Sequence, residues 1–493
     1  MRGSEANSGG RLPIDALHVD RQSGVPIQRQ IYLALRDFIL RGVLDQGTRL
    51  PATRELAKDL AISRNTAVRV YEQLSSEGYV ETRQGSRTYV ADLPSSTKAN
   101  HKLGPEASAA DLSPFAMAFD IDERIDFAPG AAALRPSTPD TGVFPFKTWN
   151  RLLGGHLLYR NVELLNYNFP YGYPPLQEAI SKYVQAYRGV RCEPDQVLVT
   201  NGAQSGLDLL ARVLLDKGDV VWMEEPGYVN ARLVFGAAGA DLRAWKVCEA
   251  GWDFADLPVG KPRVIYTTPS SQHPLGLTMG AEQRLRLLET ASQHEAWVIE
   301  DDYDSEYRLA GRSVPAMQGN DAFGRTIYVG TFAKTMFPAI RIGFVVLPPL
   351  IAQRVKRAAL YSGNQVSLPM QATLKDFIVN GHFARHLHRT RRLYAERRSI
   401  FTELVASRLG AWLQPYQSDV GIQIAYRLTR PMNDVAIARR ANQQGLNVVP
   451  LSRYYSGPPV PGLLMGYAAL DEKAMRSCLA ILASVIETSE EIH

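Results

Sequence analysis

Short apolar runs alternate with helical stretches along the chain from about residue 126 to the C-terminus. The runs cover residues 196–200, 220–223, 264–267, 296–300, 326–329 and 343–347. Strands that are buried on both faces have such continuous apolar runs, and helices between them allow successive strands to lie parallel. The pattern therefore predicts an α/β body over residues 126–493, built on a mostly parallel sheet with crossover helices.

Residues 26–92 have a different pattern, which predicts three helices followed by a hairpin. One amphipathic segment runs from Pro26 to Gly42, a second follows Pro51, and a third follows Ser63. Proline in a first turn, serine just before one and glycine after a last turn are typical helix boundaries. Two β-prone segments flank Arg83-Gln-Gly85. This order predicts a winged helix-turn-helix head, with the hairpin as its wing.

Two segments lack periodicity. Residues 1–25 are mostly polar, and residues 93–125 are rich in Ser, Ala, Pro, Lys and Asp. Because such segments bury little apolar surface, they do not fold on their own. We therefore expect a flexible arm at 1–25 and a flexible linker at 93–125 between the head and the body.

Composition limits the compartment and the partners. No apolar run approaches the roughly 18 residues of a membrane helix, and the N-terminus lacks the apolar core of a secretory signal. We expect a cytoplasmic protein with no membrane partner. The three cysteines have no metal-ligand spacing, so no metal site is expected. The net charge is +5, but residues 11–92 contain 12 basic against 10 acidic residues, and much of the excess lies in 381–398. Net charge alone is weak evidence for DNA binding.

The exposed positions of the third predicted helix are candidates for DNA contact. Arg64, Asn65 and Thr66 lie at its N-terminal end, and Arg69 lies opposite its apolar face. Arginine can read guanine and asparagine can read adenine, each by paired hydrogen bonds. Arg54 and the wing around Gly85 would reach phosphates or the minor groove. On pattern alone, the alternative is a small helical domain with a solvated charged face.

A family resemblance favours DNA binding. The strings Leu50-Pro-Ala-Thr-Arg-Glu-Leu-Ala57 and Ser63-Arg-Asn-Thr-Ala-Val68, followed by Gln84-Gly-Ser, closely resemble the winged head of GntR regulators. The chain departs from that pattern at Ala52, where the family usually has a serine that caps the second helix. Loss of such a cap costs about 1 kcal/mol, and no DNA contact depends on it.

The body contains residue types that pyridoxal phosphate (PLP) requires. The cofactor needs a lysine for its aldehyde, an anion at its ring nitrogen, a donor near its phenolic oxygen and several donors for its phosphate. Lys334 follows a predicted strand in a Thr-x-x-Lys turn. At this spacing, Thr331 and Arg341 could both bind the same phosphate. A lysine in a surface loop is the alternative for Lys334 taken alone.

Further candidates lie at the ends of other predicted strands. Asp301 and Tyr303 share one face because they are two residues apart on a strand, whereas Asp302 points the other way. Residues 200–206 close a strand and open a helix, whose free backbone amides suit a phosphate. In parallel α/β folds such strand ends meet at one edge of the sheet, where ligands bind.

The order of these motifs over about 350 residues resembles fold-type I aminotransferases. The resemblance implies Lys334 as the imine lysine, Asp301 at the ring nitrogen and Tyr303 at the ring hydroxyl. It also implies a set of phosphate and ring contacts: Thr331, Arg341, Ala203 and Gln204 at the phosphate, Tyr228 stacked on the ring, and Tyr167 reaching the phosphate of a neighbouring subunit. His273 stands where the family usually has asparagine, so its contact with the ring hydroxyl is open. Residues 381–398 resemble a helix of ordinary aminotransferases, which implies a structural role, with a DNA contact as the alternative.

The head and the body together resemble the MocR subfamily of bacterial GntR regulators over the whole chain. The resemblance implies a head-to-tail homodimer that binds a double-stranded DNA operator and controls a catabolic or biosynthetic operon. It also implies that the protein senses a small amine effector through PLP held as an imine on Lys334. The alternative is an active PLP-dependent aminotransferase with an autoregulatory head, and Lys334 does not separate the two, so the sequence leaves enzymatic turnover open.

The effector side of the expected pocket differs from that of aminotransferases. Residues 462–467 contain no arginine, whereas aminotransferases often carry one there for the substrate carboxylate. Arg453 is the nearest candidate for an effector contact, and a solvated loop arginine is the alternative. The difference favours an effector without an α-carboxylate, such as an amino sugar, an amino cyclitol or a sulfonate.

Overall fold

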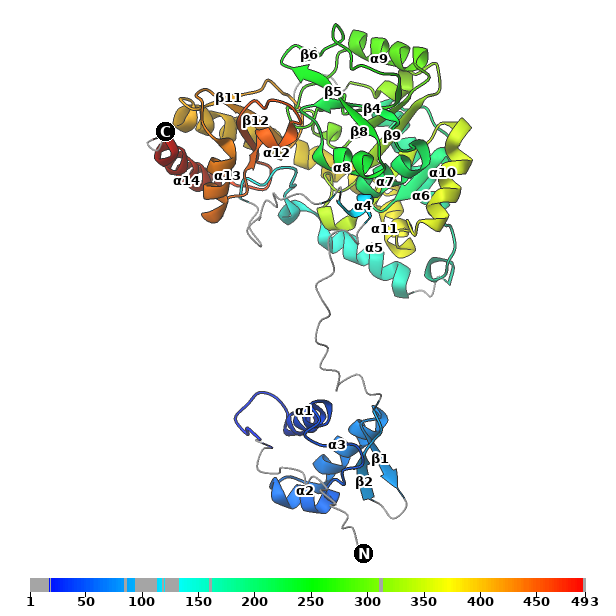
Figure 1. The fold of residues 1–493 in the computed structure, drawn as a ribbon, viewed down its shortest axis with the longest axis vertical. Coiled ribbons are helices and arrows are strands. Elements are labelled where there is room, and N and C mark those ends of the chain that lie inside the picture. Colours follow the sequence, from blue (N-terminus) through cyan, green and yellow to red (C-terminus); the bar gives the residue numbers. More distant parts are fainter. Residues whose placement is uncertain are drawn as a thin grey trace, which may run out of the picture. The chain divides into compact units, whose positions relative to one another are not determined.

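The computed structural model describes residues 17, 19–83, 87–93, 113–117, 119, 133–158, 162–309 and 314–490. The chain divides at about residue 111 into two compact units, a head and a body, which are described separately (Figure 1). Most of the arm and linker expected at 1–25 and 93–125 lies outside the described residues. No helix among the described residues is long and apolar enough to cross a membrane.

The head contains the three predicted helices and the predicted hairpin. The elements are α1 (Ile27–Leu40), α2 (Thr53–Asp59), α3 (Arg64–Ser76), β1 (Val80–Arg83) and β2 (Arg87–Val90). Strands β1 and β2 pair antiparallel, with Val80 opposite Val90. Ile31 and Leu35 of α1 pack with Val70 and Leu74 of α3 in one buried cluster. The apolar spacing of the sequence therefore identified the core of the head correctly.

The caps of α2 and α3 differ as the sequence predicts. Ser63 Oγ accepts a hydrogen bond of 3.1 Å from the backbone N–H of Thr66 and so caps α3. At α2 the Glu55 carboxylate accepts from the backbone N–H of Ala52 at 2.9 Å. Alanine has no side-chain oxygen to return a bond, so only half of a capping box is present at α2.

The body is built on an eight-stranded sheet in the order β3-β10-β9-β8-β7-β4-β5-β6. Its strands are β3 (Val197–Thr200), β4 (Val220–Glu225), β5 (Asp241–Cys248), β6 (Gly251–Trp252), β7 (Pro262–Thr267), β8 (Trp297–Asp302), β9 (Thr326–Thr331) and β10 (Gly343–Val346). Neighbouring pairs from β5 across to β9 are parallel, as predicted. Strand β10 is antiparallel to both β9 and β3, because no crossover helix separates it from β9.

Helices cover both faces of this sheet (Figure 1). They are α5 (Phe146–Leu158), α6 (Pro174–Arg188), α7 (Ala203–Leu214), α8 (Val229–Ala237), α9 (Ala281–Gln293), α10 (Pro349–Tyr361) and α11 (Leu368–Val379), with a short α4 (Pro114–Met117). Along β3, Leu198 packs with α7 and α10, whereas Val197 and Val199 pack with α6 and α11. Every residue of β3, β8, β9 and β10 is buried, which explains their continuous apolar runs.

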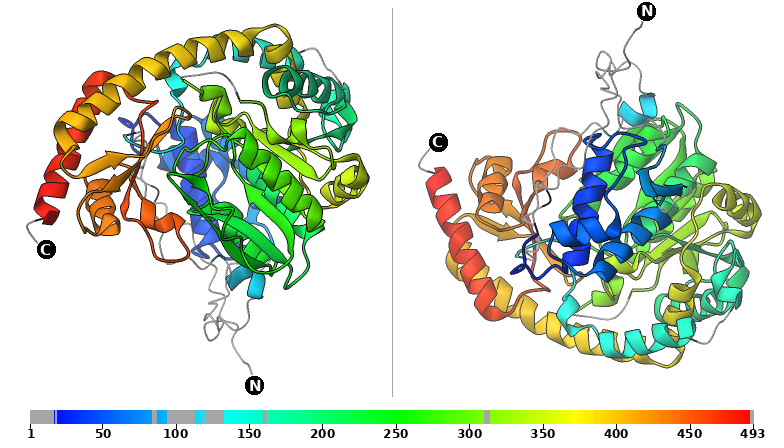
Figure 2. Two further views of the ribbon diagram at one scale, coloured as in Figure 1. Left: turned by 90° about the horizontal axis from the view of Figure 1, so that it is seen from above. Right: turned by 90° about the horizontal axis from the view of Figure 1, so that it is seen from below.

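The C-terminal part forms a second, four-stranded antiparallel sheet in the order β11-β12-β14-β13. Its strands are β11 (Leu413–Pro415), β12 (Gln423–Leu428), β13 (Val449–Pro450) and β14 (Gly462–Gly466), and its helices are α12 (His382–Leu409), α13 (Asp434–Gln443) and α14 (Glu472–Glu490). Figure 2 shows the long helix α12 along the outer side of the body with α14 beside it.

Candidate functional site

A pocket forms where several strands of the large sheet end. Strands β8 and β9 end at Asp302 and Thr331, and antiparallel β10 begins at Gly343 beside the end of β3. The pocket is lined by Ser137, Gly202, Ala203, Gln204, Tyr228, Tyr266, Thr268, His273, Asp301, Tyr303, Thr331, Ala333, Lys334 and Arg341. The structure therefore brings together every cofactor candidate of the sequence analysis except Tyr167.

Lys334 projects its amine into this pocket. Its Nζ donates a hydrogen bond of 3.1 Å to the carbonyl oxygen of Ser137. Burial lowers the pKa of the Lys334 ammonium, and the positive charges of Arg135 and Arg341 lower it further against the opposing effect of nearby carboxylates. A lower pKa leaves more of the lysine as the neutral amine, which is the nucleophilic form.

Asp301 presents one occupied and one free carboxylate oxygen. Its Oδ2 accepts a hydrogen bond of 2.7 Å from the hydroxyl of Tyr266 on β7. Its Oδ1 is buried and has no hydrogen-bond partner. Burial raises the pKa of Asp301 to about 7, although the bond from Tyr266 lowers it. Because a buried polar atom without a partner is costly, Oδ1 is positioned to accept from a ligand.

Asp302 points to the opposite side of β8, as the strand alternation predicts. Its Oδ2 accepts from Arg188 Nε and from the Tyr328 hydroxyl, both at 2.7 Å. Arg188 and Asp302 are almost fully buried, and this pair lowers the pKa of Asp302 despite its desolvation. Asp302 therefore ties α6 to the sheet and does not line the pocket.

The turn from β3 into α7 provides the anion-binding corner. Gly202 precedes the first turn of α7 with a φ of 78°, and no side chain caps that helix. A Cβ at Gly343 would lie 2.7 Å from the backbone nitrogen of Ala203, so only glycine allows β10 to pack this closely. The Arg341 guanidinium lies against Gly202 and donates weakly to the Asn201 carbonyl at 3.5 Å. Free amides and a guanidinium together suit a phosphate.

Aromatic side chains form the remaining walls. The Tyr228 and His273 rings lie edge to face with centroids 5.3 Å apart, and His273 meets Tyr303 in the same way at 5.6 Å. Burial and the charge of Lys334 lower the pKa of His273 to about 3, so its ring is neutral. The Tyr303 hydroxyl lies 3.2 Å from Ser271 Oγ. The walls can therefore hold a flat ring between apolar faces and neutral donors.

The head presents a second candidate surface, formed by α2, α3 and the hairpin. Arg54 and Arg64 line one groove there, together with Arg49 and Arg87. Asn65 and Arg69 are exposed on α3 outside that groove.

Two of the predicted DNA contacts need comment. The Thr66 hydroxyl lies 2.8 Å from Ser63 Oγ, so this residue also takes part in the cap of α3. Gly85 lies outside the described residues.

Comparison with known proteins assigns both units to families. Residues 27–90 match the bacterial regulatory proteins of the gntR family, and residues 151–482 match aminotransferase class I and II. The chain is 47% identical over 470 residues to a probable rhizopine catabolism regulatory protein, MocR, from Rhizobium meliloti, covering 95% of each chain. The chain belongs to the MocR subfamily of GntR transcriptional regulators. The resemblance noted in the sequence is thus confirmed for the head, for the body and for their order.

A further relative and a solved structure also resemble this MocR-type chain. It is 29% identical to the pyridoxine biosynthesis regulator PdxR of Corynebacterium glutamicum, covering 96% of this chain and 98% of that protein. The body shares its fold with LysN, the α-aminoadipate aminotransferase of Thermus thermophilus, with a TM-score of 0.70 at 23% identity over 78% of this chain and 98% of LysN. The likeness to LysN confirms the predicted fold class of the body.

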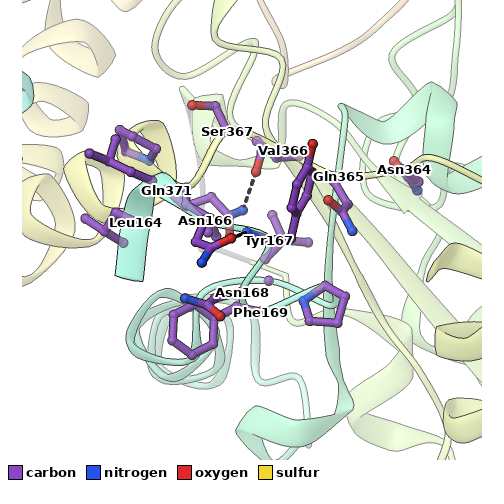
Figure 3. A pocket seen from close by; sticks show the side chains of 16 residues that line it. Leu164, Asn166, Tyr167, Asn168, Phe169, Asn364, Gln365, Val366, Ser367 and Gln371 are labelled. Atoms are coloured by element: carbon purple, nitrogen blue, oxygen red, sulfur yellow. Dashed lines mark hydrogen bonds between the residues drawn. The ribbon is translucent and has the colours of Figure 1, made fainter. Parts of the chain in front are cut away.

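Tyr167 does not reach the pocket of its own MocR-type body. Its side chain is 94% exposed and lies at a separate hollow formed by residues 164–172 and 364–371 (Figure 3). There the neighbouring Asn166 side chain accepts a hydrogen bond from the Tyr167 backbone at 2.8 Å.

The effector side of the MocR-type pocket differs from the sequence-based expectation. Arg453 lies on the 3-10 turn Leu451–Tyr454 and does not line the pocket. Arg135 is a cation whose charge lowers the pKa of Lys334. Sequence reasoning also missed Ser137 and Tyr266. The sequence around Tyr266 indicates only a buried position in an apolar strand. Ser137 lies in a loop before the first recognised motif, so the sequence does not indicate a functional role for it.

Proposed function

We propose that this MocR-type regulator holds PLP on Lys334 and uses it to sense a small primary amine, so that occupancy of the pocket sets how the head acts on its DNA operator. The free Oδ1 of Asp301 carries this proposal. It is a buried acceptor without a partner, in the pocket that also holds the lysine amine and the open end of α7. A protonated ring nitrogen would satisfy that oxygen.

Each group of PLP finds a suitable partner among the pocket residues. Asp301 would hold the ring nitrogen, and Tyr303 would donate to the phenolic oxygen. Thr331 and Arg341 would bind the phosphate with the amides of Ala203 and Gln204. Gln204 Oε1 is another buried atom without a hydrogen-bond partner among the described residues that line this pocket. Tyr228 would stack on the ring.

The cofactor supplies an aldehyde that condenses reversibly with a primary amine. Lys334 competes with the effector for that group, and its lowered pKa keeps it competitive near neutral pH. Because β14 (Gly462–Gly466) carries no arginine of the kind that aminotransferases often use for the substrate carboxylate, we infer that the effector lacks an α-carboxylate. One relative of this chain is a probable rhizopine catabolism regulatory protein.

We propose a homodimer in which Tyr167 enters the pocket of the partner. Five exposed apolar side chains gather along α5 and the segment after it: Leu157, Leu158, Val162, Leu165 and Tyr167. Contiguous exposed apolar residues of this kind mark association surfaces. Tyr167→Phe should leave the subunits associated in sedimentation but weaken PLP binding, because only the hydroxyl at the phosphate is lost.

The lysine assignment is tested by trapping the cofactor. Borohydride treatment of the PLP-loaded protein should attach the cofactor to the peptide that contains Lys334, as read by mass spectrometry. Lys334→Ala should lose both the label and the visible absorption. Lys246→Ala, an exposed lysine on β5, is the matched control and should keep both. A label on any other peptide would refute the assignment.

A further inference from the structure

The first half of α12 presents a row of three arginines and a histidine that the cofactor pocket does not use. Arg385, His388, Arg389 and Arg392 are all exposed, and their spacing of three, four and seven residues places them on one face of the helix. The opposite face buries Phe383, His386, Leu387, Thr390 and Tyr394. We call these four exposed residues the α12 cationic face.

Nothing acidic in the described residues neutralises this face. No Asp or Glu occurs between positions 377 and 395, and none of the three arginines or His388 forms an ion pair with a described carboxylate. Arg385 donates only to the Asn380 carbonyl and to His382 Nδ1. The charge of Arg151, on α5, reaches His382 from the neighbouring helix and adds to the positive potential.

The inward-facing arginines of the same helix behave differently. Arg391 donates to the carbonyl of Glu306, Arg397 pairs with Asp140 at 2.8 Å, and Arg398 donates to the carbonyl of Ser418. These three hold α12 to the rest of the body. The charges of the α12 cationic face have no such structural use.

The position of Arg385 in the first turn of α12 is electrostatically unfavourable. Cations near a helix N-terminus are disfavoured by the helix dipole, and the first turn of α12 has neither an acidic residue nor a side-chain cap. An anionic partner would offset this repulsion. A row of seven residues spans about 10 Å of helix, roughly the axial length over which one DNA strand presents three phosphates.

We propose that the α12 cationic face is a second DNA-binding surface, which contacts the phosphate backbone of duplex outside the segment held by the head. DNA fits the observations better than a membrane or a protein partner. No large apolar side chain is exposed on the described helix between His382 and Tyr394, whereas membrane-surface helices and protein hot spots need such residues. The head also keeps the body at a high local concentration of duplex.

The test compares two charge-matched double variants of the full-length dimer. Arg389→Gln with Arg392→Gln removes two cations of the face, and Arg408→Gln with Arg439→Gln removes two exposed arginines elsewhere on the body. Binding is measured against salt on a duplex trimmed to the footprint of the head and on one extended by several helical turns. Unchanged visible absorption of the PLP-loaded variants verifies that the body is intact.

On the extended duplex, the face variant should lose about 1.8 from the slope of log affinity against log salt for each subunit whose face contacts the duplex, since each lost phosphate contact contributes about 0.9. On the trimmed duplex it should match the control variant. Equal slopes for the two variants on the extended duplex would overturn the proposal, and so would an equal loss on both duplexes. Loss of binding to phosphatidylserine vesicles with unchanged DNA binding would assign the face to anionic lipid and would also overturn it.

Discussion

Replacing Tyr266 with phenylalanine isolates the contribution of a single hydroxyl to the proposed ring-nitrogen site. Tyr266 is fully buried on β7, and its hydroxyl donates to Asp301 Oδ2 at 2.7 Å. A hydrogen bond to a charged acceptor contributes about 1.5–3 kcal/mol, which corresponds to about one to two pKa units. The pKa of Asp301, about 7 in the empty pocket, should therefore rise by that amount in Tyr266→Phe.

The effect on PLP affinity should depend on pH in a specific direction. Below about pH 7 Asp301 is neutral in the cofactor-free protein, but the ring nitrogen of bound PLP requires the carboxylate. The PLP affinity of Tyr266→Phe should therefore be lower than that of the wild type by the full factor of about 10 to 100. Above about pH 9 Asp301 is ionised with or without cofactor, and the difference between wild type and variant should disappear.

The assay is a titration of cofactor-free protein with PLP between pH 6 and 9.5, followed by absorbance, with the ratio of dissociation constants as the readout. Tyr328→Phe is the matched control, because Tyr328 donates an equally short bond to Asp302, which faces away from the pocket. A ratio that does not vary with pH would mean that the variant acts through packing, and the assignment of Asp301 to the ring nitrogen would fail. The assignment would also fail if Tyr328→Phe changed the PLP dissociation constant as much as Tyr266→Phe does.

Three further outcomes are expected. Arg188→Ala should destabilise the body by about 3–5 kcal/mol in chemical denaturation, because it leaves Asp302 buried without its partner; a loss below 1 kcal/mol would contradict the buried pair. Ala52→Ser should stabilise the head by about 1 kcal/mol in calorimetry by completing the cap of α2, and no gain would argue against the observed helix start. The unfolding free energy of the cofactor-free body should fall as pH rises from about 6.5 to 8, above the range in which the lowered pKa of His273 acts in the opposite direction. Burial raises the pKa of Asp301 to about 7 and of Asp304 to about 8, so the folded chain keeps protons that the unfolded chain releases. Asp304→Asn should make the unfolding free energy depend less on pH, and an unchanged dependence would contradict the role of Asp304.

The sequence identified the parts of the pocket that depend on strand ends. Lys334 and Asp301 follow or end apolar runs, and the rule that parallel strands end at one edge brings them together. Arg341 precedes the run of β10 and reaches the same edge because β10 is antiparallel to its neighbours. The two-residue alternation also separated Asp301 from Asp302 correctly. The antiparallel course of β10 was not predicted, because an apolar run of four residues carries no sign of its direction.

What the sequence did not identify depends on contacts between distant segments. Tyr266 acts through a hydrogen bond to a strand 35 residues further along, and Ser137 meets Lys334 across 197 residues. Arg49 precedes the second helix of the head and joins its groove only because the hairpin folds back beside it. No periodicity or local motif encodes such approaches, since they follow from packing of the whole unit.

The pocket is asymmetric in a way that favours sensing over turnover. Its cofactor side is built from buried, rigid elements that include Asp301 and Thr331. The central residues of β14 are buried and apolar, and that strand carries no arginine for a carboxylate. Transamination requires each substrate to be held in one reactive orientation. The proposed sensor requires only that an amine compete reversibly with Lys334, which needs no ionic contact between β14 and the effector.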